Sequence, residues 1–318
     1  MIAYSIRRLY QLAIVMLGIT LITFGMLKAT PGDAATYLAG KEASPQRIAF
    51  VRSQRGLDRP FYVQYVKYVE AIVHGDLGES LYTGQPVTAM IREAAPITIQ
   101  LALAALLVAL LGIPLGVYSA LRQYTAWDMT LTTSALVLWG VPVFVLGPLL
   151  LWLFSYKLGW MPFGGVGEMT LGVLPAGWRS LRTLVLPALT LGIGQVAFIS
   201  YMQRASMLEV SRSDYIRTAR AKGLSDRRVV WGHGFKNALI PVLTIIGIDL
   251  GTLLGGAFIV EMVFNRPGIG HMILDATADR DPAVLAGCTL LVSVFFVLAN
   301  LLVDLAYAWV DPRVRLGE

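Results

Sequence analysis

The stretch TIQLALAALLVALLGIPLGVYSAL, residues 98–121, carries no charged side chain along 24 consecutive positions. An α-helix needs about 20 apolar residues to cross the hydrocarbon core of a bilayer, so this stretch predicts a membrane-spanning helix. The composition of the 318-residue chain agrees, because 56% of its residues are hydrophobic, only 14% are charged and the mean hydropathy is +0.65. These values exclude an ordinary soluble domain.

Five further stretches are free, or nearly free, of charge over a comparable length. They are residues 9–27, 129–156, 183–203, 238–260 (interrupted only by Asp249) and 282–303. Six spans place both ends of the chain on the same side of the membrane. The first stretch follows two arginines, as a signal peptide would, but its 19-residue core exceeds the usual apolar region of about 7 to 15 residues. We therefore expect an uncleaved first helix.

The positive charges predict the orientation of these spans, since short cytoplasmic loops carry an excess of Lys and Arg. With the N-terminus inside, the inner segments hold thirteen Lys and Arg residues and the short outer loops hold five. Both termini are therefore predicted to be cytoplasmic. The net charge of +6 follows this loop pattern, which argues against nucleic-acid binding as its cause.

The predicted fold is an all-α integral membrane protein with six transmembrane helices and both termini inside. Its predicted parts are residues 1–29 (N-terminal segment and first helix), 30–96 (extracytoplasmic helical loop), 97–312 (a five-helix core that includes a cytoplasmic loop at 208–238) and 313–318 (cytoplasmic tail).

Helix signals punctuate the long outer loop. Ser44 and Pro45 predict the start of one helix, and Gly56 predicts its end. Pro60 predicts the start of a second helix that runs to Gly75, with apolar residues at helical spacing. This loop is either a lid over the helix ends or an external docking surface.

The most informative polar segment is DYIRTARAKGLSDRRVVWGHGFKNALIP, residues 214–241, which lies between two apolar spans and is strongly basic. Ser213 or Asp214 suits the N-cap of a short helix. Gly223 stands where a left-handed residue would end that helix. The charge predicts a cytoplasmic location.

A second helix is predicted to follow directly. Ser225 suits its N-cap, Asp226 favours the positive end of its dipole, and the helix extends to an exposed Trp231. Pro241 lacks an N–H group, so the next membrane helix is expected to start just before it. The predicted order is helix, break, short helix, break, membrane helix.

Two interpretations of this basic loop compete. Most basic inner loops only fix the topology of a membrane protein. Two tight breaks and an exposed tryptophan are not needed for that, whereas a rigid protruding helix suits the groove of a partner. Binding of a soluble partner is therefore favoured.

The segment resembles the EAA loop of ABC importer permeases, in the form found in the dipeptide, oligopeptide and nickel permease family. Further matching pieces lie along nearly the whole chain: PGD at 31–33, GLDRP at 56–60, GDLGES at 75–80, VFNRPGIG at 263–270, RDP at 280–282 and DPRVR at 311–315. The chain departs from the general EAA pattern, because Arg217 stands at the glutamate position. The distance from Gly223 to Pro241 also exceeds that in sugar permeases, which indicates the peptide-type branch.

This resemblance implies a permease subunit of an ATP-driven importer for dipeptides or oligopeptides, with nickel or another small solute as the alternative cargo. The implied partners are a second homologous permease, two cytoplasmic ATP-binding subunits and an extracytoplasmic substrate-binding protein, in the inner membrane of a prokaryote. ATP and Mg²⁺ would bind to the ATPase subunits, and this chain would bind no cofactor. The residues implied to couple to the ATPases are Arg217, Ala219, Gly223, Leu224, Ser225, Asp226, Arg227, Arg228, Val229 and Val230.

The motifs of several enzymes are missing from the sequence. No GxxxxGK[ST] phosphate-binding loop occurs, so ATP hydrolysis is expected in separate subunits. Gly192-Ile-Gly194 and Gly268-Ile-Gly270 are fragments of a dinucleotide fingerprint, and we interpret them as turn or helix packing. The three histidines lie in different loops and Cys288 is alone, so neither a metal site nor a catalytic residue is predicted.

The fifth span contains the remaining candidates. Asp249 and Glu261 are acidic at membrane depth, which is costly unless they face protein, water or a partner, so both are candidates for a translocation pathway. Gly247, Gly251 and Gly255 recur every four residues and predict close helix packing, either permanent or sliding. A secondary transporter that binds coupling ions through the two carboxylates is the alternative class, although it would not need the capped inner loop.

Overall fold

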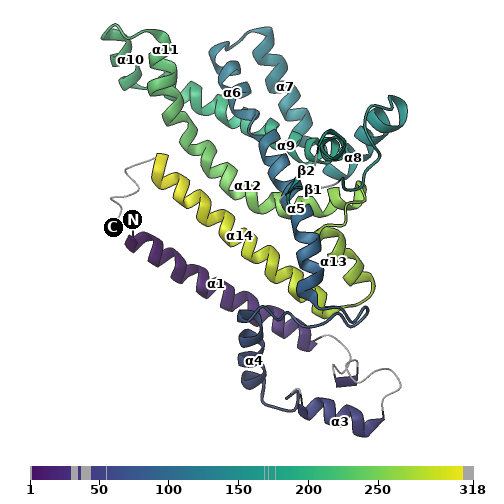
Figure 1. Cartoon of the computed structure of the whole chain (residues 1–318). Helices are drawn as coiled ribbons and strands as arrows, with labels where there is room; N and C mark the ends of the chain where they lie inside the picture. The colour runs from purple at the N-terminus through teal and green to yellow at the C-terminus, as the bar shows by residue number, and fades with distance from the viewer. Residues whose placement is uncertain are drawn as a thin grey trace. The chain divides into compact units, whose positions relative to one another are not determined.

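The computed structural model describes residues 2–29, 35–36, 44–54, 56–167, 169–170, 172–175 and 177–310. Side chains are described for the same residues except 2–9, 11–12, 169–170, 248–252, 254–256 and 302–310. The described chain is mostly helical (Figure 1).

The elements follow one another as a series of helices with one small hairpin. In chain order they are α1 (Ile2–Ala29), α3 (Pro45–Gln54), α4 (Phe61–Val73), α5 (Val87–Ala109), α6 (Gly112–Leu121), α7 (Ala126–Gly140), α8 (Val143–Leu150), the π-helix η1 (Leu151–Lys157), β1 (Met169–Thr170), β2 (Leu174–Pro175), α9 (Trp178–Ser211), α10 (Asp214–Ala221), α11 (Asp226–Arg228), the π-helix η2 (Val229–Gly234), α12 (Phe235–Val263), α13 (Ile269–Ala278) and α14 (Pro282–Val310). The two strands pair antiparallel, with Thr170 opposite Leu174.

The described residues form two compact units. One comprises Met1–Ala95 and His271–Phe295, and the other comprises Pro96–Gly270 and Phe296–Glu318. Residues 214–234, which contain the ten predicted coupling residues and are called the coupling segment below, lie in the second unit.

In the first unit, Asp281 joins two of the quoted sequence motifs. Its Oδ1 accepts hydrogen bonds from the backbone N–H groups of Ala283 and Val284 at 3.2 and 3.3 Å, so it caps the start of α14. Its Oδ2 accepts a 2.6 Å hydrogen bond from the Ser80 hydroxyl. The GDLGES and RDP motifs therefore meet at one buried carboxylate.

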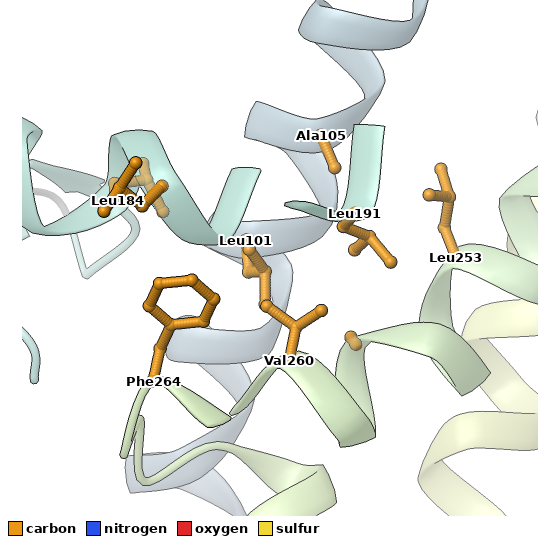
Figure 2. Close-up of a cluster of buried hydrophobic side chains, with 9 residues drawn as sticks. Leu101, Ala105, Leu184, Leu191, Leu253, Val260 and Phe264 are labelled. Carbon is orange, nitrogen blue, oxygen red and sulfur yellow. The ribbon is translucent and has the colours of Figure 1, made fainter. Parts of the chain in front are cut away.

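The core of the second unit is a stack of apolar layers between α5, α9 and α12. Leu101 of α5, Leu191 of α9 and Val260 of α12 belong to the largest layer (Figure 2). A second layer contains Ile199 and Val242, and further layers continue toward the coupling segment. Burial of these side chains away from both water and lipid holds the three helices together.

Glycines bring α6 and α9 into close contact. A Cβ atom at Gly112 would lie 2.6 Å from the Val196 carbonyl oxygen, and one at Gly116 would lie 2.5 Å from the Ser200 carbonyl oxygen. At Gly192 of α9, a Cβ would meet the Val108 side chain of α5 at 2.8 Å. Interhelical packing through small residues is typical of membrane proteins. The contact at Gly192 confirms that this glycine serves helix packing.

The prediction of a helical protein that crosses the membrane several times is confirmed. The part of the chain that the structure describes contains four helices long and apolar enough to span a bilayer, or five if the bent pair α7 and α8–η1 forms one span. α1 is 28 residues long, and its part Ala13–Ala29 is apolar. The helices around the predicted spans are longer than expected, since α5 begins at Val87 and α9 ends at Ser211.

The span predicted over residues 129–156 is broken in the structure. The helix axes before and after residues 141–142 differ by 105°. The residue before a proline is disfavoured from helical geometry, and Val141 adopts extended angles (φ −81°, ψ 119°) in front of Pro142. The absence of charge in this stretch had concealed the break.

Both helices predicted in the outer region are confirmed. α3 begins at Pro45, and the left-handed Gly56 (φ 66°) follows its end. α4 begins after Pro60 and is followed by Gly75 with φ 80°.

Candidate functional site

The candidate site begins where the long helix α9 ends. Only Arg212 and Ser213 separate α9 from α10. Ser213 occupies the N-cap position, as predicted, with extended angles (φ −71°, ψ 152°). Its hydroxyl donates a 2.6 Å hydrogen bond to the Val210 carbonyl oxygen instead of capping α10. α10 is therefore fixed to the end of α9 by a tight turn.

Gly223 ends α10 as the sequence predicts. Its φ of 77° lies in the left-handed region, which glycine adopts without steric penalty. Its N–H donates to the Arg220 carbonyl oxygen at 2.9 Å, and the Leu224 N–H donates to the Ala219 carbonyl oxygen at 3.4 Å. This is a Schellman motif, which satisfies the last carbonyl groups of a helix.

A small apolar core closes the segment on itself. Ile216, Ala219 and Val229 are at most 9% exposed and pack together, with Val210 and Leu224 against them. α10 is therefore held against the beginning of the next helix. Ala219 and Val229, both predicted as coupling residues, lie inside this core, so they would act by holding the segment in shape.

The second predicted break is absent. Ser225 precedes α11 with N-cap angles, as predicted, but α11, η2 and α12 then follow without an intervening residue (Figure 1). The separate short helix was therefore a wrong prediction. Pro241 lies inside α12 and not at its start, because a proline leaves only one carbonyl without its helical partner and the helix continues around it.

The exposed side of the segment is basic and partly aromatic. Arg227, Arg228, Trp231 and His233, together with Ser225, line a hollow of about 530 Å³. Trp231 is 50% exposed, and its ring contacts Phe235 at a centroid distance of 5.3 Å. An exposed tryptophan beside arginines is a composition found at protein interfaces.

The ten predicted coupling residues differ in exposure and form three groups. Six are exposed: Arg217, Gly223, Ser225, Asp226, Arg227 and Arg228. Leu224 and Val230 are half-buried, and Ala219 and Val229 are buried. Arg217 pairs with Asp214 on the surface of α10, and Arg220 lies 3.5 Å from Asp226 across the Gly223 turn. The exposed group is the surface on which a partner could dock.

Glu261, predicted as a pathway candidate, is fully buried. One carboxylate oxygen accepts a 2.5 Å hydrogen bond from the Thr98 hydroxyl, and the other accepts one of 2.8 Å from the Gly270 N–H. A Cβ atom at Gly268 would collide with this carboxylate, which accounts for the glycine there as close packing. These contacts favour a positioning role for Glu261 over direct contact with a passing substrate.

The other candidates of the fifth span are only partly described. Asp249, Gly251 and Gly255 belong to α12, but their surroundings lie outside the described side chains. Gly247 is buried. A pathway role of Asp249 and a packing role of the three glycines remain predictions.

Sequence reasoning missed two buried polar clusters. Arg204 of α9 binds both carboxylate oxygens of Asp128 at the start of α7. Arg266, 0% exposed, donates from Nη2 to the Gln100 Oε1 at 2.6 Å. Burial lowers the pKa of the Arg266 guanidinium below its usual value, and the nearby Glu261 charge offsets only part of this effect. The available signal was a charged residue directly at the edge of an apolar stretch, since Asp128 precedes the predicted span at 129.

Among the residues that the structure describes, no group of three His, Cys, Asp or Glu side chains is arranged to hold a metal ion. Cys288 is buried, as predicted for a small apolar side chain.

Two family profiles match the chain. The profile described as "Binding-protein-dependent transport system inner membrane component" matches residues 112–316. The profile of the corresponding N-terminal part of such membrane components matches residues 1–102. Together they cover nearly the whole chain, including the coupling segment and both buried polar clusters.

Individual proteins resemble the chain over its full length. It is 40% identical over 332 residues to the dipeptide transport system permease protein of Alkalihalophilus pseudofirmus, covering 99% of this chain and 100% of that protein. It is 39% identical over 318 residues to the oligopeptide transport system permease protein of Bacillus subtilis, again covering 99% and 100%. A solved structure of the inward-facing MetNI methionine ABC transporter superposes with a TM-score of 0.57 at 16% identity, covering 70% of this chain and 96% of that chain, which shows a common fold.

Proposed function

Because the chain belongs to the family of binding-protein-dependent transport system inner membrane components, we propose that it is the permease subunit of an ATP-driven importer for dipeptides or oligopeptides. The relatives whose names state these cargoes match essentially the whole chain at 40% and 39% identity. Proteins named in this way are transport permeases and not enzymes, so the chain's task is passage and coupling.

The observation that carries the coupling role is the shape of the segment from Asp214 to Gly234. It is folded on its own apolar core, which leaves Arg227, Arg228 and Trp231 exposed. A preformed surface of this kind loses little conformational entropy when a partner binds. We assign its partner as a cytoplasmic ATP-binding subunit.

The energy for transport would enter through that partner. The sequence has no phosphate-binding loop, so ATP and Mg²⁺ would bind to two separate ATPase subunits. Closure of those subunits on ATP would draw the coupling segments together. The permease would then exchange an inward-facing opening for an outward-facing one, by a shift between two states that each ligand favours differently.

The finer topology is also part of the proposal. It has six spans, with α1 as the first and the bent α7–η1 region as the third, and both termini in the cytoplasm. Residues 30–96 would form the extracytoplasmic loop, 97–312 the five-helix core with the coupling loop at 208–238, and 313–318 the tail. The excess of Lys and Arg in the inner segments supports this orientation.

The complete transporter would contain a second homologous permease, two ATPases and an extracytoplasmic binding protein, in the inner membrane of a prokaryote. Asp249, at mid-span in α12, is the proposed pathway residue of this chain. An importer for nickel or another small solute is the second candidate, because the sequence motifs occur in permeases for several cargoes. A secondary transporter is less favoured, since it would have no use for the exposed coupling surface.

Uptake by the reconstituted transporter tests the proposal. The assembled complex would be placed in proteoliposomes with ATP on the ATPase side, and binding protein with radiolabelled dialanine, trialanine or ⁶³Ni²⁺ on the other. Accumulation of a peptide that requires ATP and persists when ion gradients are dissipated is the expected result. Uptake of Ni²⁺ alone would assign the second cargo. Transport driven by a proton or sodium gradient without ATP would refute the importer.

A further inference from the structure

The coupling segment is connected directly to the opposite end of α12, because the break that the sequence predicted between them is absent. α11, η2 and α12 run without interruption from Asp226 to Val263. At about 1.5 Å per residue, this path is about 55 Å long, more than the hydrocarbon thickness of about 30 Å. A displacement at its coupling end therefore reaches the far end without crossing a loop.

The far end of α12 carries a cluster of buried polar groups. Thr98 of α5 lies between the end of α12 and the start of α13. Its hydroxyl donates a hydrogen bond to Glu261 at 2.5 Å and accepts one from the Ile269 N–H at 2.8 Å. The Gly270 N–H donates to the same carboxylate at 2.8 Å. Thr98 and Glu261 therefore join α5, α12 and the first turn of α13.

Arg266 extends this cluster to the loop between η1 and α9. Its Nη1 donates to the Gly165 carbonyl oxygen at 3.1 Å, and its Nη2 donates to Gln100 of α5. The Gly165 N–H in turn donates to the Phe264 carbonyl oxygen at 2.9 Å. Two hydrogen bonds thus tie this loop to the end of α12.

The cluster resists partial opening. Glu261 and Arg266 are 0% exposed, and Thr98 and Gln100 are 5% exposed. Taking a hydrogen-bonding partner away from a buried charged group leaves that group with an uncompensated desolvation cost, which exceeds the net contribution of the original contact. The end of α12, the loop and α5 are therefore expected to move together or not at all.

We propose that Thr98, Gln100, Glu261 and Arg266 are positioning residues that pass the movement of the coupling segment, carried by α12, to the loop at residues 158–167. This inference rests on the proposed function, because it requires an ATPase partner at the coupling segment. On the proposed topology the loop is extracytoplasmic, so the cluster links nucleotide binding on one side to the opening on the other.

A fluorescent reporter on the loop tests the link. Phe163 is 63% exposed, and the only native cysteine, Cys288, is 0% exposed, so Phe163→Cys provides a selective labelling position in this chain. The labelled permease is assembled into the complete transporter, and the emission change on adding a non-hydrolysable ATP analogue is measured. Thr98→Val and Gln100→Met remove polar contacts at nearly constant side-chain size, and Thr98→Ser keeps the hydroxyl as the matched control.

The expected result is a nucleotide-dependent emission change in the parent complex that is clearly smaller in Thr98→Val and Gln100→Met, because the loss of one buried hydrogen bond shifts the equilibrium that links the two ends of α12 by about fivefold. In both variants, co-purification with the ATPases and ATP hydrolysis without substrate stay normal. The control Thr98→Ser shows the same emission change as the parent complex. A full change in both variants overturns the proposal. Failure of both variants to assemble also overturns it, because a purely structural role then suffices. If the unmutated permease binds no ATPase subunit, the proposed function itself is contradicted. That outcome is seen before any variant is compared.

Discussion

Arg204 of α9 binds Asp128 of α7 in a bidentate arrangement, with Nε to Oδ1 at 2.6 Å and Nη2 to Oδ2 at 2.7 Å. The same carboxylate accepts a hydrogen bond from the Ser119 hydroxyl of α6 at 2.5 Å and one from the Tyr124 N–H at 2.9 Å. Asp128 is 2% exposed. This carboxylate therefore fastens the turn between α6 and α7 to α9, the helix that leads directly into the coupling segment.

Replacing Asp128 or Arg204 is expected to destabilise the permease, and the effects of the two replacements are expected not to add. Asp128→Asn leaves a mostly buried guanidinium without its counter-charge, which we expect to cost about 2 to 3 kcal/mol. A double-mutant cycle with Arg204→Met, followed by thermal unfolding in detergent, should give a coupling energy of about 2 kcal/mol. The exposed pair Arg220–Asp226 supplies the control, and Asp226→Asn should leave the unfolding temperature unchanged. Additive effects at Asp128 and Arg204 would contradict the clamp.

Gly223→Pro is expected to prevent assembly with the ATPases. Proline fixes φ near −65°, whereas Gly223 has φ 77°, and it removes the N–H that donates to Arg220. The end of α10 would then lose its Schellman motif and its position over Val229. Gly223→Ala should be milder, at about 1 kcal/mol. Gly194→Ala is the matched control, because that glycine lies inside α9 with no atom within 4 Å of an added Cβ. Normal co-purification of Gly223→Pro would remove the segment from the coupling path.

Arg228→Glu should weaken the same assembly by charge alone. Arg228 is exposed on the hollow next to Trp231, so reversing its charge changes the surface without disturbing the small apolar core. We expect about a tenfold loss of affinity for the ATPase, typical of losing one good polar contact at an interface. Arg179→Glu, at the exposed start of α9, controls for net charge. Pull-down of the ATPase at two salt concentrations measures the binding of both variants. Equal binding by the two variants would show that Arg228 is not at the interface.

Gly116→Ala tests the close contact between α6 and α9. The added Cβ would lie 2.5 Å from the Ser200 carbonyl oxygen and 2.7 Å from the Gln203 Cβ, so the helices must separate. Overpacking of this kind costs about 1 to 3 kcal/mol, measurable as a lower unfolding temperature in detergent. Gly140→Ala, where nothing lies within 4 Å of an added Cβ, should be neutral. Neutral behaviour at Gly116 would mean that the two helices have room to move apart.

The predictions from sequence succeeded where a local rule decides the structure. Charge-free length located the helices of the membrane region, and glycine stereochemistry located the end of α10 at Gly223. They failed where two local rules compete. Pro142 breaks an apolar stretch that length alone would keep straight. Pro241 does not interrupt α12, because the helix continues around the missing hydrogen bond.

The buried polar clusters could not be predicted for a different reason. Thr98 and Glu261 are 163 residues apart in the chain, and no periodicity in the sequence relates them. From the sequence, Thr98 is only the first residue of a predicted span, and Glu261 is only a carboxylate at membrane depth. Only the packing of α5 against α12 shows that each provides the hydrogen bond that the other needs.

Asp249→Leu is expected to lower uptake while leaving assembly intact. Asp249 belongs to α12 within the predicted fifth span, where a carboxylate is costly unless it faces protein, water or a partner. If it lines the pathway, its loss should reduce the maximal uptake rate about tenfold, the equivalent of about 1.4 kcal/mol in the transport barrier. Asp249→Asn separates the charge from the hydrogen-bonding capacity, since the amide keeps one acceptor oxygen. Uptake kinetics and ATPase co-purification are measured on the same preparations. Unchanged uptake by Asp249→Leu would assign this carboxylate to helix packing, and loss of assembly would assign it to the folding of α12.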